Sequence, residues 1–383
     1  MTETIPFSRD DYAHMARAIR LAERGLYSTD PNPRVGCVIV KNGTVVGEGW
    51  HQRAGQEHAE IHALREAGSE AGKATVYVSL EPCSHHGRTG PCSQALLEAG
   101  VNRVVAAMLD PNPQVAGSGL AMLRKAAIST QCGLLEEQAR ALNPGYLKRM
   151  SQGLPWVRVK LASSMDGHTA LADGGSHWIT GEAARADVHR LRARSSVILT
   201  GIGTVLADNP RLDARPDLPG GSYLQPSLAI VDSSLRCPPS ARCLSSTGSR
   251  SVGLYHCHGD PDRYPDTVQL VRVDSDHKGK QVDLRKVLAL LASQGANEVM
   301  VEAGPILAGA LWQGALADEL IVYMAPVFLA EGAKPLLSLE PLTSMAGRYV
   351  LQCSDLRAVG DDWRFTLRRP QNAPDEFGLT EEI

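Results

Sequence analysis

The chain has 383 residues, 43% of them hydrophobic and 21% charged, and this composition is typical of a globular protein. Its 39 lysines and arginines nearly balance 42 aspartates and glutamates, and the resulting charge of −3 argues against general nucleic-acid binding, which requires a basic surface. One hydrophobic core rarely grows to this length, so we expect two domains.

The N-terminal segment and the cysteines indicate the compartment. Residues 1–11 lack both a basic and an apolar region, which argues against a signal peptide. No apolar run approaches the roughly 18 residues that cross a membrane. The 8 cysteines are sparse, and in a reducing compartment such cysteines are metal ligands or buried small residues more often than disulfides. We therefore expect a cytoplasmic enzyme without a membrane association.

The sequence pattern of the first half of the chain predicts alternating helices and strands. Apolar residues recur at helical spacing in residues 10–24, with Ser8 as the N-cap, and Asn42-Gly43 predicts a hairpin turn. This alternation predicts an α/β sandwich for residues 1–150. The remaining predicted elements are strands at 35–40, 44–49, 75–80 and 101–108 and helices at 58–67, 92–99, 119–127 and 134–150.

A second alternating run begins after Pro155 and predicts another α/β domain over residues 151–370. Residues 209–226 read as a long loop, and 371–383 as a polar, mobile tail. Gly360-Asp361 predicts a hairpin between the last two strands. The predicted strands are 156–162, 196–200, 228–232, 252–255, 268–273, 298–302, 320–325, 349–359 and 363–369, and the helices are 181–193, 283–294 and 305–313.

One histidine and two cysteines in the first half form a candidate zinc site. His58, Cys83 and Cys92 carry the nitrogen and thiolate donors that zinc prefers, and three protein ligands leave a fourth position for water. Glu60 stands two residues after His58 and could move protons between water, a substrate ring and leaving ammonia. His-x-Glu followed by Pro-Cys is typical of the zinc-dependent deaminases.

Other interpretations of these residues stay open at this point. The site could be a structural one with four ligands, or hold no metal. Zinc deaminases commonly carry Cys-x-x-Cys, whereas eight residues separate Cys83 from Cys92, which disfavours enzymes that act on free bases or nucleic acid. His62 could pair with His58 as in metalloproteases, but their motif needs Glu where Ala59 stands. We interpret His62 as a packing residue.

A nucleotide site in the second half has a weaker signal. The G-x-G-x-x-G fingerprint is absent, because Gly201-Ile202-Gly203-Thr204 stops short of it. Residues 301–310 fit a nucleotide site better. A strand ends there, Gly304 permits a ligand to approach the backbone closely, and a new helix could bind a phosphate with its free N–H groups. An ordinary strand-to-helix turn would have the same pattern.

Several motifs together resemble the family of bifunctional riboflavin-biosynthesis deaminase/reductases, over nearly the whole chain. In the first half these motifs are residues 31–36, 58–60 and 83–92. In the second half they are residues 160–167, 176–180, 204–208 and 302–305.

The resemblance implies a cytidine-deaminase-like α/β/α sandwich followed by a dihydrofolate-reductase-like α/β domain. The first domain would hydrolyse the 2-amino group from 2,5-diamino-6-ribosylamino-4(3H)-pyrimidinone 5′-phosphate with zinc. The second would reduce the ribosyl group to ribityl with NADPH. We therefore expect a hydrolase joined to an oxidoreductase, with one zinc per chain, a small pyrimidine ribosyl phosphate as substrate, no nucleic-acid partner, and assembly as a homo-oligomer.

By position, the resemblance also implies roles for individual residues. The zinc ligands fall on His58, Cys83 and Cys92, and the catalytic proton shuttle falls on Glu60. The deaminase substrate contacts fall on Asn32, His51, His85 and Arg88. The NADPH contacts fall on Ala162, Trp178, Thr204, Asp208, Ser233, Gly304, Pro305, Ile306, Leu307, Ala308, Gly309 and Ala310. The reductase substrate contacts fall on Ser176, Arg192, Leu212, Arg215 and Glu302.

These residue types suit the implied roles. Trp178 can stack on a ring, and Arg192 and Arg215 can pair with a phosphate. The proton donor of the reduction stays open between Asp208 and Glu302, which could instead be a helix cap and a buried carboxylate that accepts backbone N–H bonds. Two alternatives for the whole chain are a tRNA or cytidine-type deaminase fused to an unrelated oxidoreductase, and a zinc-stabilised binding module with four ligands.

Overall fold

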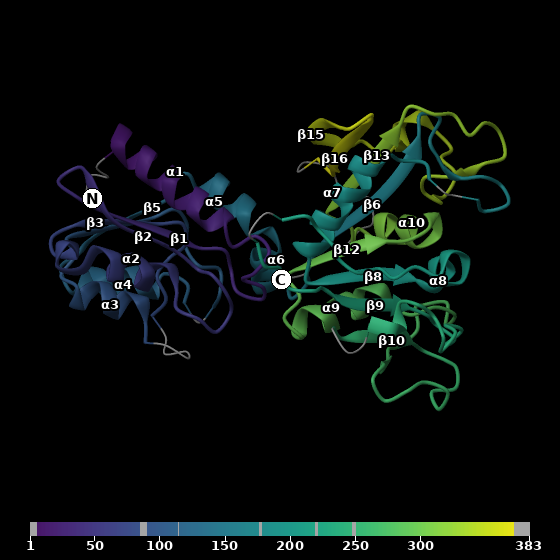
Figure 1. Cartoon of the computed structure of the whole chain (residues 1–383), viewed down its shortest axis with the longest axis horizontal. Helices are drawn as coiled ribbons and strands as arrows, with labels where there is room; N and C mark the ends of the chain where they lie inside the picture. Colours follow the sequence, from purple (N-terminus) through teal and green to yellow (C-terminus); the bar gives the residue numbers. More distant parts are fainter. Residues whose placement is uncertain are drawn as a thin grey trace. The chain divides into compact units, whose positions relative to one another are not determined.

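The computed structural model describes residues 6–84, 90–113, 115–175, 178–218, 221–246 and 250–370. Its internal contacts divide the chain into two compact units, each with its own β-sheet (Figure 1). The first unit comprises Met1–Pro155, Gly220–Leu224 and Ala289–Asn297, and the second comprises Trp156–Pro219, Gln225–Leu288 and Glu298–Ile383. The predicted tail at 371–383 lies outside the described residues.

The first unit contains a five-stranded sheet in the order β2-β1-β3-β4-β5. Its first three strands pair antiparallel, and β3, β4 and β5 are parallel. The strands are β1 (Gly36–Lys41), β2 (Thr44–Trp50), β3 (Thr75–Val78), β4 (Arg103–Ala106) and β5 (Ser129–Cys132). The helices are α1 (Arg9–Glu23), α2 (Ala59–Ala67), α3 (Cys92–Glu98), α4 (Ser118–Lys125), α5 (Glu136–Leu142) and α6 (Pro144–Gln152), with a 3₁₀ turn η1 (Gly68–Ala71).

Helices cover both faces of this sheet, because side chains alternate between the two faces along each strand. Val38 and Val40 of β1 belong to a core with residues of α1, α5 and α6. Cys37 and Ile39 belong to a second core with residues of α2, α3 and α4. The result is the α/β/α sandwich that the sequence predicts.

Two local features place α1 and α2. Ser8 caps α1 through a capping box, since its Oγ accepts from the Asp11 N–H at 3.1 Å and its own N–H donates to the Asp11 carboxylate at 2.7 Å. This confirms the predicted cap. Helix α2 lies directly on β2, because a Cβ added at Gly49 would come within 2.2 Å of the Ala59 carbonyl oxygen. Only glycine permits this close approach.

The single helix predicted at 134–150 is wrong. The structure has two helices, α5 and α6, that meet at Asn143 and Pro144. The Asn143 side chain accepts from the Arg34 N–H at 2.8 Å and donates to the Arg34 carbonyl at 2.9 Å, so it serves a distant loop instead of a helix interior. Pro144 then occupies the first turn of α6, where its missing N–H costs nothing. Strand β5 was not predicted either.

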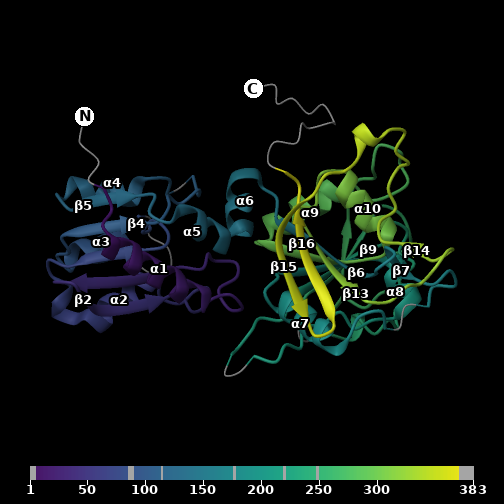
Figure 2. The same cartoon turned by 90° about the horizontal axis from the view of Figure 1, so that it is seen from above.

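The second unit contains a nine-stranded sheet in the order β11-β10-β9-β8-β12-β6-β13-β16-β15. Neighbouring strands pair parallel all the way from β11 at one edge, through β10, β9, β8, β12 and β6, to β13. The β15–β16 hairpin, yellow in Figure 2, then adds two antiparallel strands at the other edge. The strands are β6 (Trp156–Ser164), β8 (Val197–Gly201), β9 (Ser227–Val231), β10 (Val252–His256), β11 (Gln269–Arg272), β12 (Glu298–Glu302), β13 (Glu319–Ala325), β15 (Gln352–Val359) and β16 (Asp362–Arg368). The predicted hairpin is thus confirmed.

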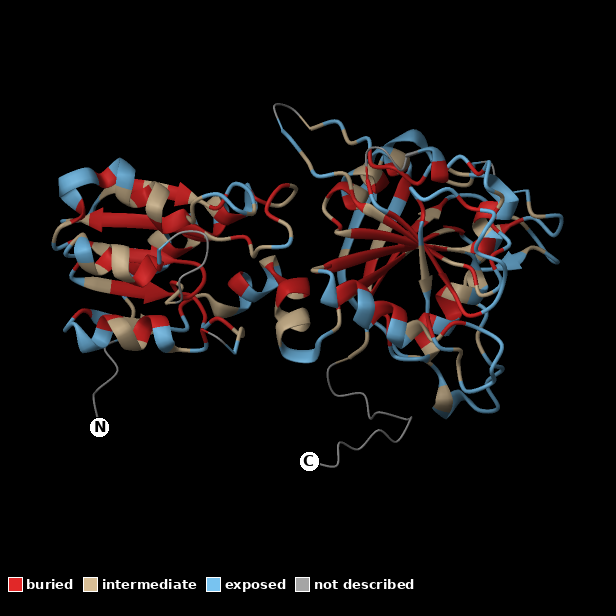
Figure 3. Ribbon diagram, turned by 90° about the horizontal axis from the view of Figure 1, so that it is seen from below, coloured by how far each residue is buried: buried red, intermediate tan, exposed pale blue. Residues whose placement is uncertain are grey.

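The described part of the second half contains the helices α7 (Glu182–Ala193), α8 (Ile202–Asp208), α9 (Leu284–Ser293) and α10 (Pro305–Gln313). A small second sheet pairs β7 (His168–Ala170) with β14 (Lys334–Pro335), and η2 (Leu244–Ser246) and η3 (Met345–Gly347) are 3₁₀ turns. The central strands are buried on both sides, as the red ribbons of Figure 3 show. Strands that are buried on both faces of a parallel sheet have nearly continuous apolar sequences. These apolar runs made the strands predictable from the sequence. Helix α8 and the small sheet were not predicted.

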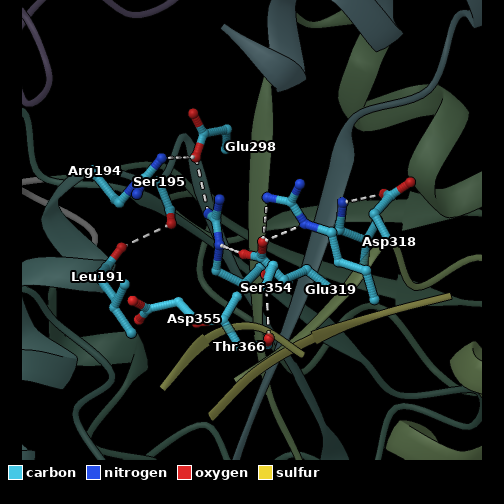
Figure 4. A network of polar contacts seen from close by, with 12 residues as sticks. Leu191, Arg194, Ser195, Glu298, Asp318, Glu319, Ser354, Asp355 and Thr366 are labelled. Carbon is cyan, nitrogen blue, oxygen red and sulfur yellow. Dashed lines mark hydrogen bonds and ion pairs between the residues drawn. The ribbon is translucent and has the colours of Figure 1, made fainter. Parts of the chain in front are cut away.

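A buried ion-pair network ties three neighbouring strands of this sheet together. Arg158 of β6 donates to Glu298 of β12 at 2.8 Å and to Glu319 of β13 at 2.5 Å. All three side chains are almost fully buried. Arg194 and Arg368 also pair with these glutamates, which are labelled in Figure 4. Since each buried charge requires its partner, the network holds the three strands in one register.

Candidate active sites

The structure brings His58, Cys83 and Cys92 together, with one donor atom of each lying within 4.8 Å of the others. His58 Nδ1 is 3.2 Å from Cys92 Sγ and 3.6 Å from Cys83 Sγ. His58 is the N-cap of α2, Cys92 is the first residue of α3, and Cys83 follows β3 in a loop. Two helix N-termini therefore point their positive ends into this cluster.

The local contacts favour a thiolate at Cys83. The hydrogen bond with the Cys92 thiol, together with that from His58, lowers the pKa of Cys83 to about 4, although burial acts in the opposite direction. The Cys92 N–H also donates to Cys83 Sγ at 3.3 Å. The same bond to Cys83 raises the pKa of His58 to about 8. A cluster that stabilises a thiolate is suited to bind a soft divalent cation.

Glu60 adds a buried carboxylate beside this cluster. Its side chain is 3% exposed, and its Oε2 has no hydrogen-bond partner among the described residues. Burial raises the pKa of Glu60 to about 6, against the lowering effect of His58. The donor set of one nitrogen and two sulfurs, with an unpartnered carboxylate oxygen beside it, fits a catalytic zinc that keeps one position for water.

Two predicted substrate contacts lie next to these residues. The Asn32 amide is 3.0 Å from His51 Nε2, and His51 Nδ1 is 3.0 Å from the Glu57 carbonyl oxygen. Burial lowers the pKa of His51, so the neutral ring donates from Nδ1 and accepts from Asn32 at Nε2. The His51 ring also meets the His58 ring edge-on at 5.4 Å. His85 and Arg88, the other two predicted contacts, lie outside the described residues.

Ser93 belongs to this site as well, although no motif in the sequence predicted it. Its N–H and its hydroxyl both donate to the Cys83 carbonyl oxygen, at 3.1 and 3.0 Å. These two bonds join the loop that carries Cys83 to the first turn of α3. The available signal was its place directly after Cys92, on a helix N-terminus.

In the second unit, the predicted cofactor contacts gather at the carboxyl ends of the parallel strands. Gly304 caps α10 directly after β12, and Thr204 lies in α8 directly after β8. A Cβ on Gly201, at the end of β8, would lie 3.2 Å from Leu307 of α10, so the two segments are neighbours. This edge of an open parallel sheet is where such folds bind nucleotides. Ala162 lies near the end of β6, and Ser233 follows β9.

Three predicted contacts have other surroundings. The Ser233 hydroxyl accepts from the Val282 N–H at 3.1 Å. Trp178 is 70% exposed, and the Arg185 guanidinium lies over its ring, 4.7 Å from the ring centroid. Asp208 is the last residue of α8, whose N-cap is Gly201, so the alternative interpretation of Asp208 as a cap of that helix is wrong. Ser176 lies outside the described residues.

The predicted reductase substrate contacts form a polar cluster around Glu302. Arg192 donates to both carboxylate oxygens of Glu302, at 2.5 and 2.9 Å, and to the Asp213 carbonyl oxygen at 2.9 Å. Arg215 approaches the Asp213 carboxylate at 3.5 Å, and Leu212 is buried beside it in the chain. The structure therefore brings these four predicted residues together, though Glu302 is held by an arginine instead of by backbone N–H groups.

The charge state of Glu302 follows from this environment. Burial favours the neutral acid, but the Arg192 charge and its hydrogen bonds outweigh burial and lower the pKa of Glu302 to about 2. Lys160 adds to this effect from β6, where it stands opposite Glu302 in the register. Burial in turn lowers the pKa of Lys160. An ionised Glu302 is poorly suited to donate a proton. Lys160 was missed as a site residue, although a charged residue within an apolar strand was a visible signal.

The fold and the two sites define a class of protein. A sandwich that collects one histidine, two cysteines and a buried glutamate at helix N-termini is a zinc-dependent deaminase domain. A parallel sheet that presents a glycine-capped helix at its carboxyl edge is an α/β domain suited to bind a nucleotide.

Comparison with known proteins identifies the family. Residues 8–108 match the model of the cytidine and deoxycytidylate deaminase zinc-binding region, and residues 155–365 match that of the RibD C-terminal domain. The riboflavin biosynthesis protein RibD of Escherichia coli K12 is 48% identical over 363 residues, covering 92% of this chain and 98% of the relative. That of Haemophilus influenzae is 45% identical over 371 residues, covering 94% and 98%. The chain belongs to the RibD family.

Solved structures agree with this result. Acinetobacter baumannii RibD, form 1, superposes with a TM-score of 0.88 at 42% identity, covering 95% of this chain and 99% of that one. A Thermotoga maritima diaminohydroxyphosphoribosylaminopyrimidine deaminase/5-amino-6-(5-phosphoribosylamino)uracil reductase gives 0.82 at 29% identity, covering 94% and 99%. The chain is therefore a bifunctional enzyme of riboflavin biosynthesis, with a zinc-dependent deaminase and an NADPH-dependent reductase. The predicted fold class and activities are confirmed.

Among the described residues, no helix has both the length and the apolar character that crossing a bilayer needs.

Proposed function

We propose that the deaminase converts 2,5-diamino-6-ribosylamino-4(3H)-pyrimidinone 5′-phosphate and that the reductase then turns the ribosyl group of the product into ribityl. We assign the deaminase to residues 1–150, the reductase to residues 151–370 and a tail to residues 371–383. The observation that carries the proposal is the cluster of His58, Cys83 and Cys92 beside the unpartnered oxygen of Glu60. The name of the Thermotoga maritima relative supports this choice of substrates.

In the deaminase, His58, Cys83 and Cys92 would hold zinc, which would supply a Lewis acid for the activation of a water. Glu60 accepts one proton of the attacking water at Oε2 and transfers it to the adjacent ring nitrogen. It then accepts the second proton of that water, once the oxygen is bonded to the ring carbon, and passes it to the amino group, so that the carbon–nitrogen bond breaks and ammonia leaves. A carboxyl group that is not itself a metal ligand can both accept and donate a proton. Burial of Glu60 limits competing protonation by bulk solvent.

The deaminase substrate is held by four residues in this proposal. The Asn32 amide, which His51 orients, contacts the pyrimidine ring. His51 itself lies against His58, one of the proposed zinc ligands. His85 and Arg88 belong to the loop between the two cysteines, and Arg88 could bind the phosphate through two parallel hydrogen bonds.

In the reductase, NADPH supplies the hydride. Gly304 and the following residues of α10 present free N–H groups for its phosphates. Arg192 and Arg215 bind the substrate phosphate, and ionised Glu302 orients Arg192. The other proposed cofactor contacts are Ala162, Trp178, Thr204, Asp208, Ser233 and residues 305–310, and the other substrate contacts are Ser176 and Leu212.

We also propose a homo-oligomer that works in the cytoplasm and binds no nucleic acid. The near-balance of 39 basic and 42 acidic residues supports the last point. Cys37, Cys132 and Cys353 form no disulfide, which suits a reducing compartment. Light scattering on the purified chain measures the assembly, and a monomer at micromolar concentration would contradict the expected oligomer.

The deaminase assignment is tested by Glu60→Gln, which keeps the shape of the side chain but cannot carry the proton. We expect deamination to fall about 10²- to 10⁴-fold, while zinc content and NADPH-dependent reduction stay unchanged. Product masses with and without NADPH separate the two steps. His62→Gln, on the same helix, is the matched control. Loss of zinc from Glu60→Gln would show that Glu60 is a ligand and would contradict the assignment.

A further inference from the structure

Glu81 is a buried carboxylate that the chemistry described above does not use. It lies between β3 and Cys83, and its side chain is buried. Its Oε2 accepts from the Gly117 N–H at 2.8 Å and the Asp110 N–H at 3.2 Å, and its Oε1 accepts from the Leu120 N–H at 3.1 Å. All three donors are backbone groups of a segment that follows β4.

This carboxylate caps a helix from outside. Helix α4 begins at Ser118, and its N-cap is Gly117 with φ +85°, which has no side chain to accept the free N–H groups. Glu81 supplies the missing acceptor for Gly117 and Leu120. A negative charge at this position also meets the positive end of the helix dipole. The segment of Glu81 is thereby bound to the start of α4.

Pro82, the residue after Glu81, packs against α4 through its backbone carbonyl group. A Cβ added at Gly119 would lie 1.9 Å from the Pro82 carbonyl oxygen and 3.3 Å from Glu81 Oε1. The first turn of α4 therefore packs directly against the Glu81-Pro82 segment, with no space for a side chain between them. One residue later comes Cys83, whose carbonyl oxygen accepts two bonds from Ser93 at the start of α3.

We propose that Glu81 is a positioning residue of the zinc site. Its carboxylate holds the segment from Glu81 to Cys83 against α4, so that Cys83 Sγ meets His58 and Cys92. The inference rests on the proposed zinc site and adds to it an outer support that links the metal loop to a third helix. Outer partners of this kind set how precisely a ligand is presented to the metal.

The test uses Glu81→Gln in the full-length chain. The side chain keeps its shape, but one oxygen becomes an NH₂ group that faces backbone donors. We expect the zinc affinity, measured by competition with a chromophoric chelator, to fall about 10- to 100-fold. The absorption bands of the Co²⁺-substituted protein should shift as the thiolate geometry changes. Glu81→Asp, which keeps the charge on a shorter side chain, should give an intermediate affinity.

A matched control separates positioning from simple stability. Ser8→Ala removes the cap of α1, so it should lower the melting temperature without changing zinc affinity or the cobalt spectrum. If Glu81→Gln also keeps the wild-type affinity and spectrum, Glu81 is only a helix cap and the inference is overturned. If the wild-type chain binds no zinc, the proposed function fails instead.

A second variant reaches the same segment without changing any charge. Gly119→Ala places a methyl group against the Pro82 carbonyl oxygen and should also weaken zinc binding. Gly72→Ala is its control, since the nearest atoms to a Cβ there are 3.6 and 3.9 Å away. Wild-type affinity in a folded Gly119→Ala chain would contradict the inference even if Glu81→Gln failed to fold.

Discussion

At the scale of single residues, Asp11 is a buried charge whose ionisation stabilises the first unit. Its carboxylate accepts from Ser8, from the Tyr77 hydroxyl at 2.6 Å and from Arg103 at 2.7 Å. Burial alone would favour the neutral acid, but Arg103, Tyr77 and Ser8 outweigh it and hold the pKa of Asp11 below its ordinary value of 3.8. The stabilisation is therefore fully present above pH 3.8 and disappears as the pH falls through the lower, folded-state pKa.

Because folding lowers the pKa of Asp11, the effect of replacing this residue should depend on pH. Asp11→Asn should lower the free energy of unfolding at pH 7 by about 2–4 kcal/mol, because Arg103 loses its charged partner. The difference from wild type should shrink as the pH falls below 3.8. Urea unfolding of the full chain at several pH values measures both. A difference that stays constant down to pH 2 would contradict the prediction.

Arg192 offers a second test, in the reductase. Arg192→Ala removes a proposed phosphate contact and leaves Glu302 without its partner, so the KM for the reductase substrate should rise about 10- to 100-fold. Deamination should not change, since Arg192 lies in the other unit. Arg190→Ala, at an exposed position of the same helix, is the control. A parallel loss of both activities would argue against separate sites.

The residues of the candidate sites were predictable to different degrees. His58, Glu60 and Cys83 stand in short motifs whose spacing reflects the chemistry, so the sequence alone predicts their grouping. Glu81 was not predicted, because its partners are backbone N–H groups 29 to 39 residues further along the chain. The pairing of Glu302 with Arg192, 110 residues apart, likewise depends on tertiary structure.

At the scale of secondary-structure elements, the close packing of α2 on β2 places both His58 and Glu60. Gly49→Ala would bring a methyl group within 2.2 Å of the Ala59 carbonyl oxygen, so α2 must shift. We expect a destabilisation of about 1–3 kcal/mol and a clear loss of deamination. Reduction serves as an internal reference, and Gly72→Ala as the control, since a Cβ there makes only ordinary contacts at 3.6 and 3.9 Å. Wild-type deamination in Gly49→Ala would show that α2 can adjust without moving the site.

The elements themselves illustrate what periodicity can predict. Long amphipathic helices such as α1 and buried strands such as β12 were predicted nearly to the residue, because burial imposes the pattern that identifies them. Short elements at exposed positions carry little such pattern, and β5 was missed for that reason. The break between α5 and α6 was missed because Asn143 pairs with Arg34, 109 residues earlier.

At the scale of the whole molecule, each unit has its own sheet and its own hydrophobic cores. The division into two α/β domains was predictable because the motifs of two different chemistries occupy separate halves of the chain. The candidate metal ligands all belong to the first unit, and Lys160, Arg192 and Glu302 all belong to the second. The two reactions therefore have separate chemical requirements.

Removal of zinc should consequently abolish one activity and spare the other. Within the described residues, the one group with metal-ligand geometry is His58, Cys83 and Cys92, while the Glu302 cluster is held by arginine and lysine charges. After treatment with dipicolinate and desalting, the full chain should lose deamination and keep NADPH-dependent reduction of the deaminated substrate. Added Zn²⁺ should restore deamination, because the two hydrophobic cores of the first unit are built from residues other than His58, Cys83 and Cys92. Loss of both activities at the same chelator concentration would mean that the reductase also depends on the metal.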